Sequence, residues 1–391
     1  MMRDHESVNG GAMSRQPMVE EGGRRAAGGE ARQQPLAGTT SGITMEELQL
    51  ATRNHGMPLE ALCYDVTPVG LHYLLTHFDI PAVDERSWRL EVGGHVHGRL
   101  SLDLDQLRGR PAVTTPVTME CAGNGRAWLQ PRPLSQPWLH EAVGTAEWTG
   151  TPLRGLLEEA GVLDGALEVV FTGVDRGVQG GVEHAYERSL PLAEALRDEV
   201  LLAWAVNGQP LPPQHGFPLR LLVPGWYGMA SVKWLHRITV VTEPFRGYQQ
   251  TPAYLLQSSE DDPGVLVTRI EPRSLLVPPG IPDFFSRARL LRPGRHVLRG
   301  RAWSGRAPIA RVEISSDGGA SWRPAQLGEQ RRRWAWVAWS LPWEATPGEY
   351  ELCSRAVDEA GNSQPLEQPW NLGGFANNAV QRVQVVVGPW R

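Results

Sequence analysis

The chain has 391 residues, enough for two or three domains that each bury a core. Its formal net charge of −5 is nearly balanced, so we expect no nucleic-acid or membrane partner. The three cysteines, Cys63, Cys121 and Cys353, are far apart and form no CxxC pair, which argues against a disulfide framework and a zinc site. No apolar run in the sequence approaches the ~18 residues of a transmembrane helix.

The first 41 residues are rich in glycine, arginine, glutamine and glutamate, and we predict a disordered tail at 1–41. The pair Arg24-Arg25 is superficially similar to a twin-arginine export signal, but the stretch that follows it is not apolar. We therefore expect a cytoplasmic protein.

Residues 42–250 mix strand and helix signals. Alternating or continuous apolar residues predict strands at 87–96 and 168–173, and a β-branched run predicts another at 113–117. The helix signals lie at 101–107, 152–161 and 190–196. This mixture predicts an α+β domain with mixed sheets.

Beyond a bridge at about 244–264 the pattern changes to short strands separated by turns. A strand at 310–315 runs into the hairpin signal 316–319, and further strands are predicted at 333–339, 350–356 and 380–386. These strands predict an immunoglobulin-like β-sandwich over 251–391. We expect Trp334, Trp336 and Trp339 to share one face of their strand, as sandwich core or as an interface.

Cys121 carries the clearest chemical signal. It leaves the 113–117 strand within the run Met119-Glu120-Cys121-Ala122-Gly123-Asn124-Gly125-Arg126. The glycines allow close backbone approach, and Arg126 should lower the pKa of the thiol and can hold an anion beside it. The run thus predicts a thiolate that ligates a soft metal or attacks a substrate. The alternative is a buried structural cysteine.

The single lysine is the second signal. Lys233 stands against 37 arginines in the whole chain. It follows a glycine- and proline-rich block, 207–225, that contains His215 and Arg220. A compact ammonium on a flexible stem is hard to replace by a planar guanidinium in a tight pocket. Chance survival of one lysine in an arginine-biased chain is the alternative.

The cysteine run and the lysine block each resemble a segment of the same protein family. The run 119–126 is similar to the molybdenum-ligating segment of the sulfite oxidase family, and 207–235 is similar to its pterin-binding block. The resemblance implies a sulfite oxidase-like α+β molybdopterin-binding domain at 42–250 and a dimerisation domain at 251–391, hence a homodimer. It implies a molybdenum-molybdopterin cofactor whose metal takes one protein ligand, the Cys121 thiolate.

The resemblance also implies roles for further residues. The cofactor-binding residues would be Tyr73, His77, Asp175, His215, Arg220, Ser231 and Lys233. The catalytic residues would be Cys121, Arg126, Trp138 and Tyr254. A phosphate on the pterin suits both an arginine fork and a lysine.

Two positions depart from the family pattern. Leu75 stands where the family has an arginine that helps to bind sulfite, and Gly373 stands where some members place another. Arg53, in an earlier Arg-Asn-His run, is a candidate to replace the missing charge. Without that charge we expect poor oxidation of sulfite or another substrate.

The expected activity is oxygen-atom transfer to a small anionic or sulfur-containing substrate. No His-Pro-Gly-Gly haem motif occurs in the sequence, so we expect no haem and an external electron acceptor. One alternative is an enzyme with the same fold that reduces an oxide such as a sulfoxide. Others are a hydrolase that uses Cys121 with His215 as base, and a non-catalytic binding protein built on the sandwich.

Overall fold

The structure is a computed structural model that describes residues 42–330 and 332–390. The tail predicted at 1–41 lies outside the described residues. Among the helices of the described part, none is both long and apolar enough to cross a bilayer.

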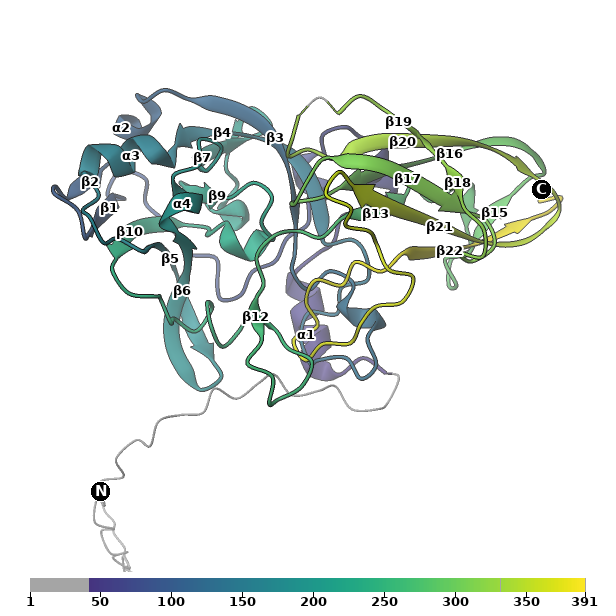
Figure 1. Ribbon diagram of the computed structural model, residues 1–391, viewed down its shortest axis with the longest axis horizontal. Coiled ribbons are helices and arrows are strands. Elements are labelled where there is room, and N and C mark those ends of the chain that lie inside the picture. The colour runs from purple at the N-terminus through teal and green to yellow at the C-terminus, as the bar shows by residue number, and fades with distance from the viewer. Residues whose placement is uncertain (1–41, 331, 391) are drawn as a thin grey trace, which may run out of the picture. The chain divides into compact units, whose positions relative to one another are not determined.

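Two sheets build the first domain, coloured blue to teal in Figure 1. One has the order β2-β1-β10-β5-β6 and contains a parallel pair, β1 with β10; the other has the order β3-β4-β7-β8, with β9 paired to β7. The strands are β1 Leu90–Gly94, β2 Leu100–Leu102, β3 Val113–Glu120, β4 Val143–Pro152, β5 Glu168–Gln179, β6 Val182–Pro191, β7 Leu201–Val206, β8 Gln209–Pro210, β9 Arg220–Leu222 and β10 Leu235–Val241. The predicted α+β class with mixed sheets is confirmed.

Short helices connect these strands. The α-helices are α1 Met45–Arg53, α2 Leu104–Arg108, α3 Leu153–Ala160 and α4 Leu192–Ala195, and the 3₁₀ turns are η1 Leu59–Cys63, η2 Val69–Leu71, η3 Arg126–Trp128, η4 Pro213–His215 and η5 Gly228–Ala230. The predicted helix at 101–107 begins late because 100–102 pairs as β2 and Asp103 caps α2. The one predicted at 190–196 begins late because Pro191 still pairs with Glu168 in β5.

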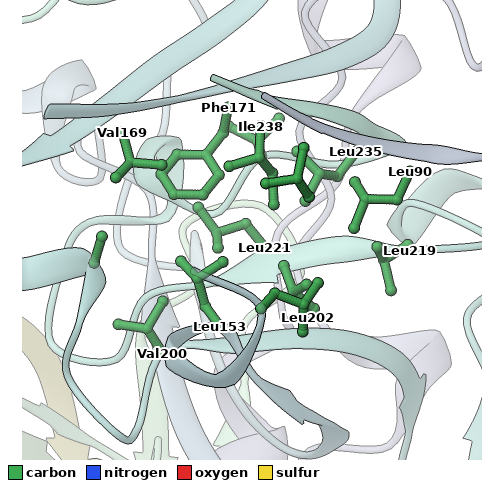
Figure 2. Close-up of a cluster of buried hydrophobic side chains, with 14 of the residues drawn as sticks. Leu90, Leu153, Val169, Phe171, Val200, Leu202, Leu219, Leu221, Leu235 and Ile238 are labelled. Carbon is green, nitrogen blue, oxygen red and sulfur yellow. The ribbon is translucent and has the colours of Figure 1, made fainter. Parts of the chain in front are cut away.

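The core of the first domain lies between the two sheets and the helix α3. Figure 2 shows side chains of both sheets meeting there, with Phe171 of β5 and Leu202 of β7 among them, next to Leu153 of α3. Each of these three is fully buried. Burying a side chain of this size contributes about 1.5–3 kcal/mol, so this layer holds the two sheets in a fixed relation.

The second domain is a β-sandwich, coloured green to yellow in Figure 1. Its sheets have the orders β13-β16-β20-β19 and β14-β15-β22-β21-β17-β18, and a separate ribbon β11-β12 precedes them. The strands are β11 Leu255–Leu256, β12 Val265–Leu266, β13 Arg273–Leu276, β14 Ile281–Pro282, β15 Arg289–Leu291, β16 Gly294–Trp303, β17 Ile309–Ser315, β18 Arg323–Pro324, β19 Gln326–Leu327, β20 Val337–Ala345, β21 Gly348–Asp358 and β22 Gln381–Val387. The predicted sandwich is confirmed.

The prediction for the three tryptophans is wrong. Trp334 and Trp336 precede β20, which begins at Val337. Trp339 packs inside the sandwich core, whereas Trp336 packs with residues of both domains and its backbone N–H donates to Thr118 Oγ1 at 2.8 Å. Period-two alternation applies only inside a strand, and within one it places 336 and 339 on opposite faces.

Candidate active site

Cys121 follows directly on β3. Its backbone N–H donates to the carbonyl oxygen of Ala142 at 2.9 Å, and its own carbonyl accepts from the N–H of Asn124 at 3.0 Å. Gly125 has φ 91°, and a Cβ there would lie 2.9 Å from the carbonyl oxygen of Asn377. Only glycine fits this turn, which bends the chain sharply after the thiol.

Glu120 fixes this turn to the second domain. Its buried carboxylate accepts from Arg273 Nη1 at 2.6 Å, from Trp303 Nε1 at 2.7 Å and from Asn124 Nδ2 at 3.0 Å. Arg273 belongs to β13 and Trp303 to β16, so two sandwich strands hold the residue next to Cys121. Because the pair is buried, losing either charge would leave the other uncompensated.

All seven residues predicted to bind the cofactor line a single cavity of about 70 Å³, here called the inner cavity. They are Tyr73, His77, Asp175, His215, Arg220, Ser231 and Lys233. Cys121 and Tyr254 line the same cavity. These residues, up to 181 positions apart in sequence for Tyr73 and Tyr254, thus converge on one space next to the thiol.

Lys233 is one of the residues that line the inner cavity. Its ammonium donates to the carbonyl oxygens of Leu75 at 2.9 Å and Gln214 at 3.0 Å. Burial lowers the pKa of Lys233 to about 7; the Arg220 charge lowers it further, and Asp175 opposes both. A phosphate within reach would favour the charged form.

Arg220 is the second buried cation. Its guanidinium donates to the carbonyl oxygens of His215 and Ser231, both at 3.1 Å, and the Ser231 hydroxyl accepts from the N–H of Val223 at 3.1 Å. Burial lowers the pKa of Arg220 to about 10, so it stays charged at neutral pH. Burial, together with the charge of Arg220, lowers the pKa of His215 to about 2, which leaves a neutral imidazole.

Two polar atoms at the inner cavity have no partner among the described residues: Asp175 Oδ1 and His72 Nε2. Burial raises the pKa of Asp175 to about 7, against the opposing charge of Lys233. Buried polar atoms in native proteins nearly always have hydrogen-bond partners. A ligand with ring N–H donors and acceptors would satisfy both atoms.

The four residues predicted to be catalytic line a second cavity of about 250 Å³, the outer cavity. They are Cys121, Arg126, Trp138 and Tyr254. The two cavities share the lining residues Leu75, His77, Cys121 and Tyr254. The thiol therefore lies where the two cavities adjoin.

Arg126 is buried in the wall of the outer cavity. It donates through Nε to the carbonyl oxygen of Gly374 at 3.2 Å, through Nη2 to that of Gly373 at 3.1 Å, and through Nη1 to Ser135 Oγ at 2.8 Å. Its Cζ lies 5.0 Å from the centre of the Phe375 ring. Three of the four partners belong to the loop before β22, so the sandwich domain positions this cation.

The Cys121 thiol and two of its neighbours, Tyr254 and His77, are neutral at neutral pH. Burial raises the pKa of Cys121; Arg126 lowers it, as expected, but by less than burial raises it. The Tyr254 hydroxyl lies 2.9 Å from His77 Nε2. Burial raises the pKa of Tyr254 and, with the charges of Lys233 and Arg126, lowers that of His77 to about 3. The Trp138 side chain also lowers the pKa of the thiol, by less than Arg126 does.

The positions that depart from the family pattern also have defined environments. Leu75 lines both cavities. Arg53 is absent from the described linings: it bonds the carbonyl oxygen of Phe78 and lies 3.7 Å from the exposed Asp79 carboxylate, although its charge helps to lower the pKa of His77. A Cβ at Gly373 would lie 2.4 Å from the Phe375 ring, so a side chain at 373 requires that ring to move.

The sequence did not indicate several lining residues. His72 and Tyr186 line the inner cavity, and Gln179, Gln249 and Phe375 line the outer one. None belongs to the cysteine run or the lysine block. Only His72 among them has a usable sequence signal, because it lies next to Tyr73, which the resemblance assigns to cofactor binding.

This donor set fits a molybdenum-molybdopterin group. Lys233 and Arg220 would hold a phosphate, Asp175 and His72 would satisfy ring atoms, and the Cys121 thiolate would ligate a soft metal. No cluster of three or more His, Cys, Asp or Glu side chains in residues 42–330 and 332–390 is placed to hold a metal. A metal at Cys121 would thus take its other ligands from the cofactor. Fold and site together define a molybdopterin-type oxidoreductase.

Comparison with known proteins agrees. Residues 77–249 match the family model "oxidoreductase molybdopterin binding domain" and 285–388 match "Mo-co oxidoreductase dimerisation domain". The chain is 36% identical over 342 residues to mitochondrial sulfite oxidase of Mus musculus and 32% identical over 354 residues to nitrate reductase [NADH] 1 of Oryza sativa subsp. japonica. These alignments cover 83% and 82% of this chain, and 62% and 38% of the relatives.

Among solved structures, the sulfane dehydrogenase SoxCD from Paracoccus pantotrophus superposes with a TM-score of 0.75 at 27% identity, covering 90% of this chain and 88% of that one. The chain belongs to the sulfite oxidase family of molybdopterin-dependent oxidoreductases. It spans 62% of the length of the mitochondrial sulfite oxidases of Mus musculus and Homo sapiens.

Proposed function

We propose that this protein catalyses oxygen-atom transfer to a small sulfur compound and passes the electrons to an external acceptor. The observation that carries the proposal is the place of Cys121, shared by a cation-lined inner cavity and an outer cavity with one substrate-side arginine. A bound molybdenum-molybdopterin supplies the two-electron chemistry that adds an oxygen atom to a substrate.

The side chains around the thiol then have separable tasks. Arg126, held by the carbonyls of Gly373 and Gly374, would bind a negatively charged oxygen of the substrate. The Tyr254 hydroxyl and His77 imidazole, 2.9 Å apart and both neutral, would hold a water or a proton near the reacting oxygen. The apolar side chains of Leu75 and Phe375 would limit the access of other water.

The hydrolase alternative has less support. Among the described residues no hydrogen bond joins Cys121 to His215, and the His215 ring instead packs edge-on against His72, with ring centres 5.7 Å apart. A cysteine nucleophile needs a base within hydrogen-bond reach. Burial also raises the pKa of the Cys121 thiol, which disfavours a free thiolate.

The test begins with the cofactor content of protein made in a host that synthesises molybdopterin. We expect close to one molybdenum and one pterin per chain, and turnover of sulfur substrates with an artificial electron acceptor. The control is the same protein from a host unable to make the cofactor, which should be inactive. Metal-free protein that hydrolyses esters would reject the proposal, and loaded protein that only reduces sulfoxides would reverse its direction.

A further inference from the structure

The outer cavity offers a substrate a single formal charge. Its described lining contains Arg126 and no lysine, aspartate or glutamate. His77 also lines it and is neutral. Arg188 is buried nearby, but its Cζ lies 5.3 Å from the centre of the Tyr254 ring, and it is absent from the lining. A dianion in this cavity would therefore keep one charge uncompensated.

Arg126 nevertheless requires an anion. Its side chain is 4% exposed, and all three of its hydrogen-bond acceptors are neutral oxygens. Three of its five N–H groups are used by these oxygens, so two have no partner in the described chain. Two N–H groups on one guanidinium match two oxygens on one substrate group. A neutral sulfoxide would leave this buried charge unpaired.

The wall of the outer cavity is partly apolar, with Thr76, Gln136 and Gln179 among its polar residues. Hydrocarbon side chains from five separate segments line it: Leu50, Leu75, Phe78, Leu134, Val178 and Phe375. The cavity of about 250 Å³ is also large for an inorganic ion of four or five atoms. Apolar walls next to one cation suit a substrate with an organic group attached to its charged end.

These observations favour one chemical class. We propose that the preferred substrate is an organic sulfinate, a monoanion with two oxygens, a sulfur lone pair and a hydrocarbon substituent. This inference rests on the proposed function and narrows it. Arg126 would bind the two sulfinate oxygens, and the substituent would lie along Leu75 and Phe375.

The reaction balances as a two-electron oxidation. The sulfur lone pair forms one new S–O bond with an oxygen that derives from water, and the product is the sulfonate. Two protons leave to solvent and two electrons pass to the external acceptor, which is reduced. No bond to carbon is broken, and substrate and product carry the same single charge.

Equilibrium binding tests the charge and the apolar wall without turnover. Titration calorimetry on the molybdenum-loaded protein would compare sulfate with methane-, propane- and hexanesulfonate, which are redox-inert products. We expect propanesulfonate to bind at least tenfold more tightly than sulfate. Each added methylene should tighten binding by about fourfold until the cavity is filled. Tighter binding of sulfate, or no dependence on chain length, would overturn the inference.

Steady-state kinetics provides the second arm. With one artificial acceptor, kcat/KM for propanesulfinate should exceed that for sulfite by at least tenfold. Leu75→Arg adds a second cation to the lining and should reverse this order, whereas Leu167→Arg, on a half-exposed leucine outside both linings, should leave it unchanged. If Leu75→Arg fails to fold, the comparison of kcat/KM for propanesulfinate and sulfite on the wild-type enzyme decides whether the inference holds.

The outcomes separate this inference from the proposed function. A loaded enzyme that prefers sulfite overturns the sulfinate inference and leaves oxygen-atom transfer to sulfur intact. A loaded enzyme that reduces sulfoxides and oxidises no sulfinate overturns both. Protein without molybdenum from a cofactor-competent host also overturns both, and metal analysis identifies that case before any substrate is added.

Discussion

The inner and outer cavities share the Cys121 thiol but differ in the charged groups that line them. The inner one has two buried cations, Lys233 and Arg220, both of which donate to backbone carbonyls, together with the unpartnered oxygen of Asp175. The outer one has one buried cation, Arg126, in a wall that combines hydrocarbon side chains with uncharged polar ones. One domain supplies nearly the whole inner lining, whereas the outer lining includes Phe375 from the sandwich. Cofactor retention and substrate choice can therefore be perturbed separately.

Replacing the shared residue should have the largest effect. Cys121→Ser removes the thiolate and should reduce turnover to the assay background, because a hydroxyl is a poor ligand for a soft metal. The pterin content should persist, since its binding groups are elsewhere. The matched control is Cys63→Ser, at an exposed cysteine far from both linings, which should keep full activity. Normal turnover by the Cys121 variant would exclude this residue as the metal ligand.

Lys233→Ala should perturb the inner cavity alone. A charge-assisted hydrogen bond contributes about 1.5–3 kcal/mol, so losing the one to a phosphate should weaken cofactor retention by roughly 10–100-fold. The measurement is pterin and molybdenum per chain after dialysis. Lys233→Arg tests whether the charge alone suffices, and we expect it to restore little because the ammonium fits between two carbonyls. Equal cofactor content in the wild type, Lys233→Ala and Lys233→Arg would contradict a role of Lys233 in binding the cofactor phosphate.

Glu120→Gln should loosen the turn between the cavities. It leaves the Arg273 guanidinium buried without its counter-charge, and breaking such a pair costs about 3–5 kcal/mol. Denaturant unfolding followed by tryptophan fluorescence measures that loss. Glu313→Gln removes the half-exposed partner of Arg355 on the sandwich and should cost under about 1 kcal/mol. Similar losses for both variants would contradict a special role for the buried pair.

The smallest predicted effect concerns helix α1, which contributes Leu50 to the outer cavity. The Arg132 guanidinium lies 2.7 Å from the buried Glu47 carboxylate and lowers its pKa below the ordinary value. A carboxyl group with a lowered folded-state pKa stabilises the fold above its unfolded pKa, and this stability is lost as pH falls through the folded pKa.

We therefore expect Glu47→Gln to lower the melting temperature at pH 7 and to differ less from wild type near pH 3. Thermal unfolding of both proteins at the two pH values measures this convergence. A gap that widens on acidification would show that the carboxylate does not act through Arg132.

The sequence predicted the inner cavity far better than the outer one. Most of its lining comes from the cysteine run, the lysine block, the segment around Tyr73 and Asp175, which contain the residues that the resemblance predicts, whereas Tyr186 has no such signal. The outer lining depends on a loop that precedes β22, and no periodicity or local motif shows that Gly373 and Gly374 would bond Arg126. Contacts between residues about 250 positions apart are set by how two domains dock, which the local pattern does not encode.

The same limit explains the errors. The sequence alone leaves Arg53 either as a replacement for the missing charge or as a false match to the family run, and the structure directs it to Phe78 and Asp79. The prediction for the tryptophans is wrong because β20 begins only at Val337 and because positions 336 and 339, three apart, lie on opposite faces of any strand. The net rise in the Cys121 pKa reflects burial, which the sequence indicates only indirectly.

The bonds from Arg126 to Gly373 and Gly374 have a consequence for recombination. A gene fusion that exchanged the whole C-terminal module would also exchange the carbonyls that aim this cation and the phenylalanine ring that it packs against. Such a chimera would inherit its cofactor chemistry from one parent and part of its selectivity from the other. Selection for a new substrate can thus act on the C-terminal domain, although the family model that matches this domain is named only for dimerisation.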